Sequence, residues 1–343
     1  MDGIRSGTVM SIWEKETERV QMKKYDVAAL GELLVDFTMN GTSGQGNPLF
    51  EANPGGAPCN VLSMLQRLGK QTAFIGKVGE DSFGKMLRDA VAEQGIDISN
   101  LVADKDVPTT LAFVHTAFDG DRSFSFYRNP GADMMLRKEE VDPSLLKDAR
   151  IFHFGSLSMT DEGIESVTRM AVETAKEGGA WISFDPNLRP PLWKSLDRAK
   201  EKIAYGISRC DILKISDDEI EFFTGTSDID EGVAKIQNEY HTPLICATMG
   251  KLGSRSYYRG ERVECEPFLS EDTIETTGAG DTFMACVLNA VLEQGLDGLD
   301  RQKLYEMLEF ANAAASIITK KKGALRVMPR KEEILRLIQE RKR

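Results

Sequence analysis

The sequence predicts an α/β fold with a small β insertion, in which helices cover both faces of a mostly parallel central sheet and give three layers. Three observations lead to this prediction. Apolar and β-branched runs alternate with helical patterns from Tyr25 onward, two stretches interrupt this alternation, and 343 residues suffice to bury such a core.

The alternating pattern gives the expected elements in order. Strands are expected where short apolar runs stand between turns, and helices where apolar residues recur every three or four positions. The first such helix carries Val61, Leu62, Leu65 and Leu68 on one face and stops at Gly69. The expected strands lie near 26–37, 71–78, 151–155, 180–185, 211–215 and 243–248, and the expected helices near 57–68, 82–94, 163–178 and 302–319.

Two segments, 38–53 and 107–128, lack helical periodicity and predict this insertion. The second segment reads as two strands, Thr109–Thr116 and Arg122–Tyr127, around Asp119-Gly120, which is a strong hairpin turn signal. An exposed β flap also leaves strand edges unpaired, which favours association with a second copy. We therefore expect a small β insertion and a homodimer that forms through it.

The two ends of the chain differ from its middle. Residues 1–24 show no clear period, and Glu14, Lys15 and Arg19 stand where a secretory signal would need an apolar core. We expect residues 1–24 to be a mobile extension, residues 25–330 to form the fold, and residues 331–343 to form a C-terminal helix or tail.

Composition excludes several classes of function. The chain has 43 basic and 54 acidic residues and a net charge of −11, whereas nucleic-acid binding requires clustered basic residues. No apolar run is long enough to span a membrane. The five cysteines are scattered and odd in number, so neither a disulfide framework nor a zinc site is indicated, and a reducing cytoplasm fits.

The most informative stretch is Glu275-Thr-Thr-Gly-Ala-Gly-Asp281, which leads directly into an apolar helical pattern. Gly278, Ala279 and Gly280 allow the backbone to aim its amides, with the start of the helix, at an anion. Asp281 at the rim is placed to accept the proton of a hydroxyl that attacks a phosphoryl group. The alternative is that this stretch only caps a helix.

A second glycine turn, Asn53-Pro-Gly-Gly-Ala-Pro-Cys-Asn60, precedes the helix near 57–68. The two turns together resemble the two signatures of the ribokinase-like sugar kinases, also called the phosphofructokinase B family, in order and in spacing. The resemblance runs from about Tyr25 to about Arg330 and implies the ribokinase-like three-layer fold, with the β insertion as a small β-sheet lid over the sugar. Other segments, such as Asp185-Pro-Asn-Leu-Arg189, look most like fructokinases.

The resemblance implies a sugar site. In similar kinases the aspartate at Asp36, the backbone of Gly55 and Gly56, and Asn60 hold the sugar, and the amides near Gly278 to Asp281 meet the transferred group. Asp36 ends the first expected strand, where it is otherwise read as a strand-end cap. Arg189, at a strand end, and Arg128, which closes the lid strand, are further sugar-binding candidates, although Arg128 reads equally as a surface residue.

The resemblance also implies a site for ATP and Mg²⁺. Thr248, Gly250 and Gly253 form a turn after a strand and belong to it with Lys214, Asn187 and Asn312, while Glu219 organises Mg²⁺ through water. Lys214 to Glu219 also read as a polar strand end before a helix. The run Lys320-Lys321-Lys322 reads as a solvated helix end or as a neighbour of nucleotide phosphate.

Three positions depart from the family pattern. Leu62 stands where a small residue is usual, Ser216 replaces an asparagine, and Glu275 replaces an aspartate. The last change bears on the monovalent-cation site, for K⁺, that the resemblance implies beside this side chain.

The function expected from the resemblance is an ATP-dependent sugar kinase that converts fructose to fructose 6-phosphate. Competing substrates within the class are 2-keto-3-deoxygluconate, ribose and nucleosides such as aminoimidazole riboside. A catalytically silent scaffold would lack the base or the anion turn, and both are present. A nicotinamide dehydrogenase would need Gly-x-Gly-x-x-Gly after the first strand, which Gly31-Glu32-Leu33 does not supply.

Overall fold

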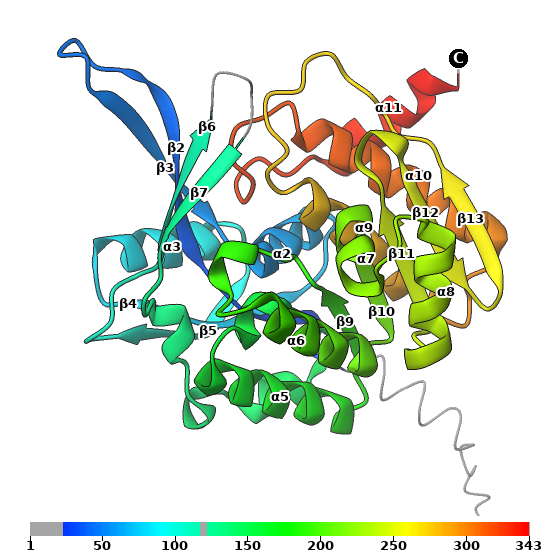
Figure 1. The fold of residues 1–343 in the computed structure, drawn as a ribbon, viewed down its shortest axis with the longest axis horizontal. Coiled ribbons are helices and arrows are strands. Elements are labelled where there is room, and N and C mark those ends of the chain that lie inside the picture. Colours follow the sequence, from blue (N-terminus) through cyan, green and yellow to red (C-terminus); the bar gives the residue numbers. More distant parts are fainter. Residues whose placement is uncertain (1–22, 117–121, 343) are drawn as a thin grey trace, which may run out of the picture.

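A nine-stranded sheet forms the centre of the computed structural model, which describes residues 23–116 and 122–342 (Figure 1). All neighbouring strands are parallel except at one edge, where the last two pairings are antiparallel. In spatial order the strands are β13 (Glu261–Cys265), β12 (Ser254–Tyr258), β11 (Leu244–Thr248), β10 (Ile212–Ser216), β9 (Trp181–Asp185), β8 (Ala149–Gly155), β1 (Tyr25–Leu30), β4 (Thr72–Gly79) and β5 (Asp97–Asp104).

Helices cover both faces of this sheet, which confirms the predicted three layers. Alternate residues of a strand enter opposite cores: Val27 of β1 faces one core and Ala28 faces the other. The first core is completed by α2 (Ala57–Arg67), α3 (Ser82–Glu93), α9 (Ala279–Gln294), α10 (Arg301–Ile318) and α11 (Lys331–Arg341). The second is completed by α4 (Pro143–Lys147), α5 (Glu162–Glu177), α6 (Leu196–Arg209), α7 (Asp217–Thr224) and α8 (Ile229–Tyr240).

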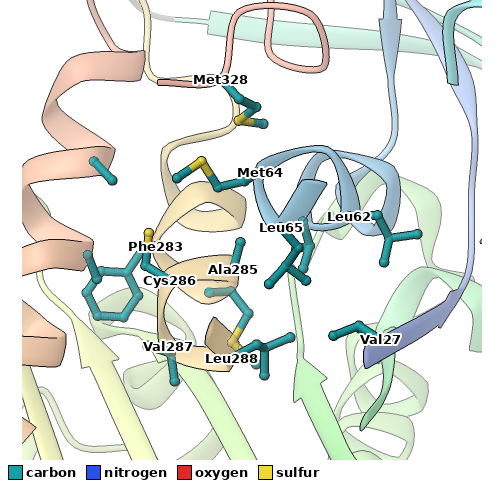
Figure 2. Packing of buried hydrophobic residues seen from close by; sticks show 14 of the residues in the cluster. Val27, Leu62, Met64, Leu65, Phe283, Ala285, Cys286, Val287, Leu288 and Met328 are labelled. Carbon is teal, nitrogen blue, oxygen red and sulfur yellow. The ribbon is translucent and has the colours of Figure 1, made fainter. Parts of the chain in front are cut away.

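Helices α2 and α9 pack against each other in the first core (Figure 2). Leu65 of α2 and Leu288 of α9 are fully buried beside Val27 of β1. This contact fixes the two helices relative to each other and to the sheet. It therefore brings together the two glycine turns that precede them.

The predicted lid is a four-stranded sheet beside the main one (Figure 1). Its strands, in spatial order, are β3 (Pro48–Gly55), β2 (Leu34–Thr42), β6 (Leu111–Thr116) and β7 (Arg122–Tyr127). Strands β6 and β7 pair in antiparallel register, which confirms the predicted hairpin. The turn at Asp119-Gly120 lies outside the described residues.

The prediction of one strand over 26–37 is wrong. Strand β1 ends at Leu30 in the main sheet, and β2 begins at Leu34 in the small sheet. A Cβ on Gly31 would lie only 2.6 Å from Cγ of Pro58, so the chain bends here in close contact with the first turn of α2. Asp36 consequently lies inside the lid sheet and does not end a strand of the main sheet.

Helices α6 and α8 and the hairpin of β12 and β13 were not predicted. Strand β13 has five residues, and its exposed positions carry Glu261, Arg262 and Glu264, so its apolar signal is weak. Arg259-Gly260 between the two strands, both with positive φ, is the turn signal that marks this hairpin.

Most of the predicted N-terminal extension, residues 1–22, lies outside the described residues. At the other end, the predicted C-terminal helix is α11, and its Ile334 and Ile338 join the first core. Within the described residues, no helix combines the length and the apolar character that crossing a bilayer requires.

Candidate active site

A cavity of about 590 Å³ lies between the small sheet, the first turns of α2 and α9, and the loops after β9 and β10. The carboxyl ends of parallel strands are the usual place for ligands in α/β proteins. Most of the predicted sugar and phosphate residues meet here. The side chains and turns that line the cavity include Glu32, Asp36, Asn53, Gly56, Asn60, Asn187, Arg189, Lys214, Glu219, Glu275, Gly278, Gly280, Asp281 and Gly323.

The anion turn, residues Thr276–Asp281, leads into α9. Gly278 has a φ of 75°, and a Cβ there would approach Cβ of Ala324 to 2.7 Å, so only glycine fits without strain. Ala279 begins the helix, and a Cβ on Gly280 would lie 3.2 Å from Nζ of Lys214. An ammonium group and the positive end of a helix thus converge on one part of the cavity wall, which is the arrangement that binds a phosphate.

Asp281 lies in the first turn of α9 and contacts the other glycine turn. Nδ2 of Asn60 donates a hydrogen bond of 2.8 Å to Oδ2 of Asp281, while Oδ1 of Asn60 is buried and has no partner among the described residues. Burial raises the pKa of Asp281, and the Asn60 hydrogen bond together with the charges of Lys214 and Arg189 opposes this rise. A raised pKa makes this carboxylate a stronger proton acceptor than a solvated aspartate.

Asp36 reaches the same cavity from β2. Burial raises its pKa to about 7, although the charge of Arg189 opposes the rise and the carboxylates of Glu275 and Asp281 add to it. Any Cβ on Gly55 would collide with the Asp36 carboxylate, so this glycine leaves room for it. Among the carboxylates that line the cavity, Asp36 lies on the lid and Asp281 lies at the start of α9.

Glu32 is a cavity residue that the sequence analysis missed. Only 4% of its surface is exposed, and Oε1 accepts a 2.9 Å hydrogen bond from the amide of Ala57 in the first turn of α2. Burial raises its pKa to about 7. A glutamate between Leu30-Gly31 and Leu33-Leu34 is a charge inside an apolar run, and that pattern is the signal that marks it.

Lys214 is held by a second residue that was missed, Asp185 at the end of β9. Nζ of Lys214 lies 3.2 Å from Oδ1 and 3.2 Å from Oδ2 of Asp185, and both side chains are buried. Burial alone would lower the pKa of Lys214, but the carboxylates of Asp185, Glu219 and Asp281 raise it above its ordinary value. The lysine thus carries its positive charge next to the anion turn.

Glu219 caps helix α7 and lines the cavity. Its Oε2 accepts the amide hydrogen of Ser216 at 2.9 Å and its Oε1 accepts that of Leu188 at 2.8 Å, while Ser216 caps the helix in return. Serine thus fills the local role of the expected asparagine at position 216. Among the described residues, no group of three or more acidic, histidine or cysteine side chains could hold a metal ion.

The loop after β9 supplies Asn187 and Arg189. Asn187 has a φ of 43°, and its amide donates to Oδ1 of Asp185 at 3.1 Å. This left-handed conformation turns the chain so that both side chains line the cavity. Arg189 is close enough to influence the pKa of both Asp36 and Asp281.

Arg128 is not brought to the cavity. Its guanidinium is buried, pairs with Asp133 through Nε at 2.8 Å, and also donates to Oγ1 of Thr160 and the carbonyl of Leu157. This geometry does not support the predicted direct contact with the sugar, and the reading as a surface residue does not hold either. Arg128 instead ties the end of lid strand β7 to the body of the protein.

Four predicted nucleotide residues lie beyond the cavity. Thr248 ends β11 next to Ser216 of β10, and Gly250 and Gly253 flank the turn that follows. Asn312 of α10 is buried, accepts from the Ser254 hydroxyl, and donates to the carbonyls of Cys265 and Glu266. These residues continue the same edge of the sheet past Lys214.

Glu275 lines the cavity directly before the anion turn. Its Oε1 accepts a 2.8 Å hydrogen bond from the amide of Gly323, and 8% of its surface is exposed. One oxygen of the side chain at the implied K⁺ site is thus already engaged by the protein. The carboxylate fits a cation ligand less well than a free side chain would.

The chain is similar in sequence and in fold to known proteins. Residues 24–331 match the family model described as "pfkB family carbohydrate kinase". Fructokinase-1 of Zea mays is 40% identical over 315 residues, which cover 91% of this chain and 97% of the relative. Two solved structures are also similar. A fructokinase from Xylella fastidiosa with bound ATP has a TM-score of 0.85 and 33% identity, and covers 94% of this chain and 100% of its own. A fructokinase from Vibrio cholerae O395 with fructose, ADP and calcium has a TM-score of 0.82 and 28% identity, with coverage of 92% and 99%.

Proposed function

Because the chain belongs to the pfkB family of carbohydrate kinases, we propose that it is an ATP-dependent fructokinase that makes fructose 6-phosphate. One observation carries the proposal. The Asp281 carboxylate lies in the first turn of α9, in hydrogen-bond contact with Asn60 and in the same cavity as Lys214 and Asp36. A base, a phosphate site and a hydroxyl-binding carboxylate thus share one cavity.

The sugar would lie between the lid and the start of α2. Asp36 accepts hydrogen bonds from sugar hydroxyls, and the unpartnered Oδ1 of Asn60 accepts another. The backbone at Gly55 and Gly56 allows close approach, because a side chain at either position would collide with Asp36 or with the chain at Glu32. Of the two predicted arginines, we assign Arg189 and not Arg128 to the sugar site. The acidic side chains around this site favour an uncharged sugar.

The phosphates of ATP would face Lys214 and the amides that begin α9. Asp281 takes the proton of the sugar hydroxyl while the hydroxyl oxygen bonds to the γ-phosphorus and the bond from that phosphorus to the ADP oxygen breaks. The amides of Ala279, Gly280 and Asp281 stabilise the charge on the transferred group. Mg²⁺, when bound with ATP, neutralises phosphate charge, and Glu219 would hold it through water.

The nucleotide base and ribose would extend along the sheet edge past Lys214. Thr248, Gly250 and Gly253 bound the turn after β11, and Asn312 fixes the neighbouring loop through its three hydrogen bonds. Asn187 stands where the phosphates would pass. We therefore assign these residues to the ATP site, with Asn312 acting through the loop that it holds.

The small sheet serves as a lid and, we propose, as a dimer interface. Val114 and Phe126 face the cavity and exclude water from it. On the other face Phe37 and Phe113 stack at 4.8 Å, Phe113 meets Tyr127, and Tyr127 is 66% exposed. A second copy would cover this aromatic face.

Sedimentation at micromolar concentration should show a dimer that Tyr127→Glu weakens, and a wild-type monomer would contradict the proposal.

We also place the enzyme in the cytoplasm, because its five cysteines are buried free thiols.

The proposed activity is tested by coupled ADP-release assays with fructose, ribose, 2-keto-3-deoxygluconate and aminoimidazole riboside. Fructose should give the highest kcat/KM, and an isomerase and dehydrogenase coupled assay should detect fructose 6-phosphate as the product. A higher kcat/KM for any other member would replace fructose, and no turnover with ATP bound would favour a silent scaffold.

A further inference from the structure

The segment that leads into the anion turn is held by the loop after α10, residues Thr319–Gly323. The amides of Ile274 and Glu275 both donate to the carbonyl of Thr319, at 2.8 and 3.1 Å. The amide of Gly323 donates back to Oε1 of Glu275 at 2.8 Å. The loop therefore holds residues 274 and 275 from two sides, directly before the turn at Thr276.

The same loop contacts the lid hairpin of β2 and β3. Nζ of Lys322 donates to Oδ1 of Asn40 on β2 at 3.1 Å. Oδ1 of Asn53 on β3 lies over Gly323, because a Cβ on Gly323 would be 3.2 Å from it. Nδ2 of Asn53 donates to Thr38 across the hairpin at 2.8 Å, so the position of Asn53 depends on the hairpin itself.

Asn53, Gly323 and Glu275 thus form a continuous wall of the cavity, from the lid to the anion turn. Glu275 is the one of these three that carries a charge, and it is nearly buried. Its charge also acts on Asp36 of the lid, whose pKa it helps to raise. A movement of the lid would therefore displace Gly323. Through the Glu275 hydrogen bond it would also shift the turn that holds the transferred phosphoryl group.

We propose that Glu275 is a positioning residue that couples the lid hairpin to the anion turn by accepting the amide hydrogen of Gly323. The proposal rests on the proposed kinase function and adds a route by which binding at one end of the cavity affects the other. The coupling requires a hydrogen-bond acceptor of the length of glutamate. It does not require a bound monovalent cation. The contact thereby replaces the implied role of K⁺ at this position.

The coupling is measured by hydrogen–deuterium exchange of the lid peptides covering residues 34–55. A non-hydrolysable ATP analogue should slow exchange there at least threefold in wild type and in Glu275→Gln, which keeps the acceptor, and should have little effect in Glu275→Ala. The measurement needs no turnover, so it stays informative if fructose is not the substrate. Equal protection in wild type and Glu275→Ala would overturn the proposal, as would loss of protection in Glu275→Gln.

Glycine variants test the same route if Glu275→Ala fails to fold. Gly323→Ala adds a side chain against Asn53 at a φ of 76°, whereas Gly179→Ala adds one at a φ of 77° with nothing within 4 Å. The two substitutions impose the same backbone strain, but only the first meets the lid. Lid protection should be lost in Gly323→Ala and kept in Gly179→Ala, and equal behaviour of the two would contradict the route.

Kinetics complete the test and separate positioning from cation binding. Glu275→Ala should lower kcat at least tenfold and leave the Kd of ATP without sugar within threefold, and Glu275→Gln should restore kcat to within threefold of wild type. Replacing K⁺ by tetramethylammonium should change wild-type kcat less than twofold. Activation by K⁺ of fivefold or more that is lost in Glu275→Gln would show that the side chain is a cation ligand and would overturn the proposal.

Discussion

Asp36 and Asp281 show how one cavity gives two carboxylates different tasks. Burial raises the pKa of both, and the charge of Arg189 opposes the rise at both, but Asp281 also receives a hydrogen bond from Asn60 and faces Lys214, whereas Asp36 faces the carboxylates of Glu275 and Asp281. Asp281 is therefore placed beside the proposed phosphate site, where the proton of the attacking hydroxyl would be taken. Asp36 lies on the lid, where we propose that it holds hydroxyl groups of the sugar.

Loss of the Asp36 carboxylate should affect the sugar alone. Asp36→Ala should weaken fructose binding by about 1.5–3 kcal/mol for each charged hydrogen bond lost, and ATP affinity should stay nearly constant because Lys214 and the anion turn are unchanged. Calorimetric titration of each ligand into the folded variant measures both. Equal weakening of both ligands would indicate structural damage, and unaltered sugar binding would leave Asp36 without a role in recognition.

Sequence reasoning found the residues of this site that stand inside glycine turns or directly after apolar runs, such as Asn60 and Lys214. It missed Asp185 and Glu32, because what identifies them is a partner distant in sequence: Lys214 for Asp185 and the amide of Ala57 for Glu32. For Arg128 the sequence left a sugar contact and a surface position equally open, because it does not show that Asp133 lies within reach of the guanidinium. Pairings of buried charges depend on the tertiary fold.

At the scale of elements, the site depends on helix α9 beginning where it does. Gly278 in its left-handed conformation ends the preceding turn, and α9 packs on α2 so that Asn60 reaches Asp281. Gly280 is the second residue of α9 and lies against the Lys214 ammonium. The N-terminus of the helix is therefore open to an anion, with a lysine beside it.

Gly280→Val should damage phosphoryl transfer more than sugar binding. The new side chain crowds Nζ of Lys214 and the amides of the turn, and losing one donor of this kind typically costs about 10²- to 10³-fold in kcat. Gly163→Val is a matched control, because Gly163 is the second residue of α5 and lies outside the cavity, and the nearest atom to a Cβ added there is 3.6 Å away. Steady-state kinetics with both variants decide whether the turn is more than a helix cap; unchanged kinetics in Gly280→Val would mean that it is not.

The elements themselves were predictable to different degrees. The apolar strands β8 to β11 and helices α2, α3, α5 and α10 follow from periodicity, because each buries a continuous stripe or run. The bend between β1 and β2 was not predictable, since Gly31-Glu32-Leu33 continues the apolar run and only the approach of Pro58 shows why the chain turns. Strands of two different sheets were therefore read as one strand.

At the scale of the whole molecule, the bend that places Asp36 on the lid also buries Glu32 between the two sheets and α2. Its pKa, raised to about 7, makes folding stability depend on pH. Between the ordinary pKa of 4.5 and about 7 the folded state binds more protons at this group than the unfolded state does. The stability contributed by this group is thus present at low pH and is lost as pH rises through this window.

Replacing Glu32 should remove that dependence. The free energy of unfolding of Glu32→Gln relative to wild type should rise between pH 5 and pH 8 by about 3 kcal/mol, because each pH unit that separates the folded and unfolded pKa values corresponds to about 1.4 kcal/mol. Urea unfolding at a series of pH values gives both curves, and their difference isolates this residue from the other carboxylates. A difference that stays constant with pH would show that Glu32 is charged in the folded protein throughout.

We propose that the whole assembly delivers a sugar hydroxyl to Asp281 beneath a phosphoryl group held by Lys214 and α9. The most direct measurement is single-turnover phosphorylation of fructose by Asp281→Asn, together with the Kd of each substrate. Phosphoryl transfer should slow by about 10²- to 10⁴-fold, the usual effect of a positioned base, with both Kd values near those of wild type. Transfer at a rate close to that of wild type, with both substrates bound, would contradict the account.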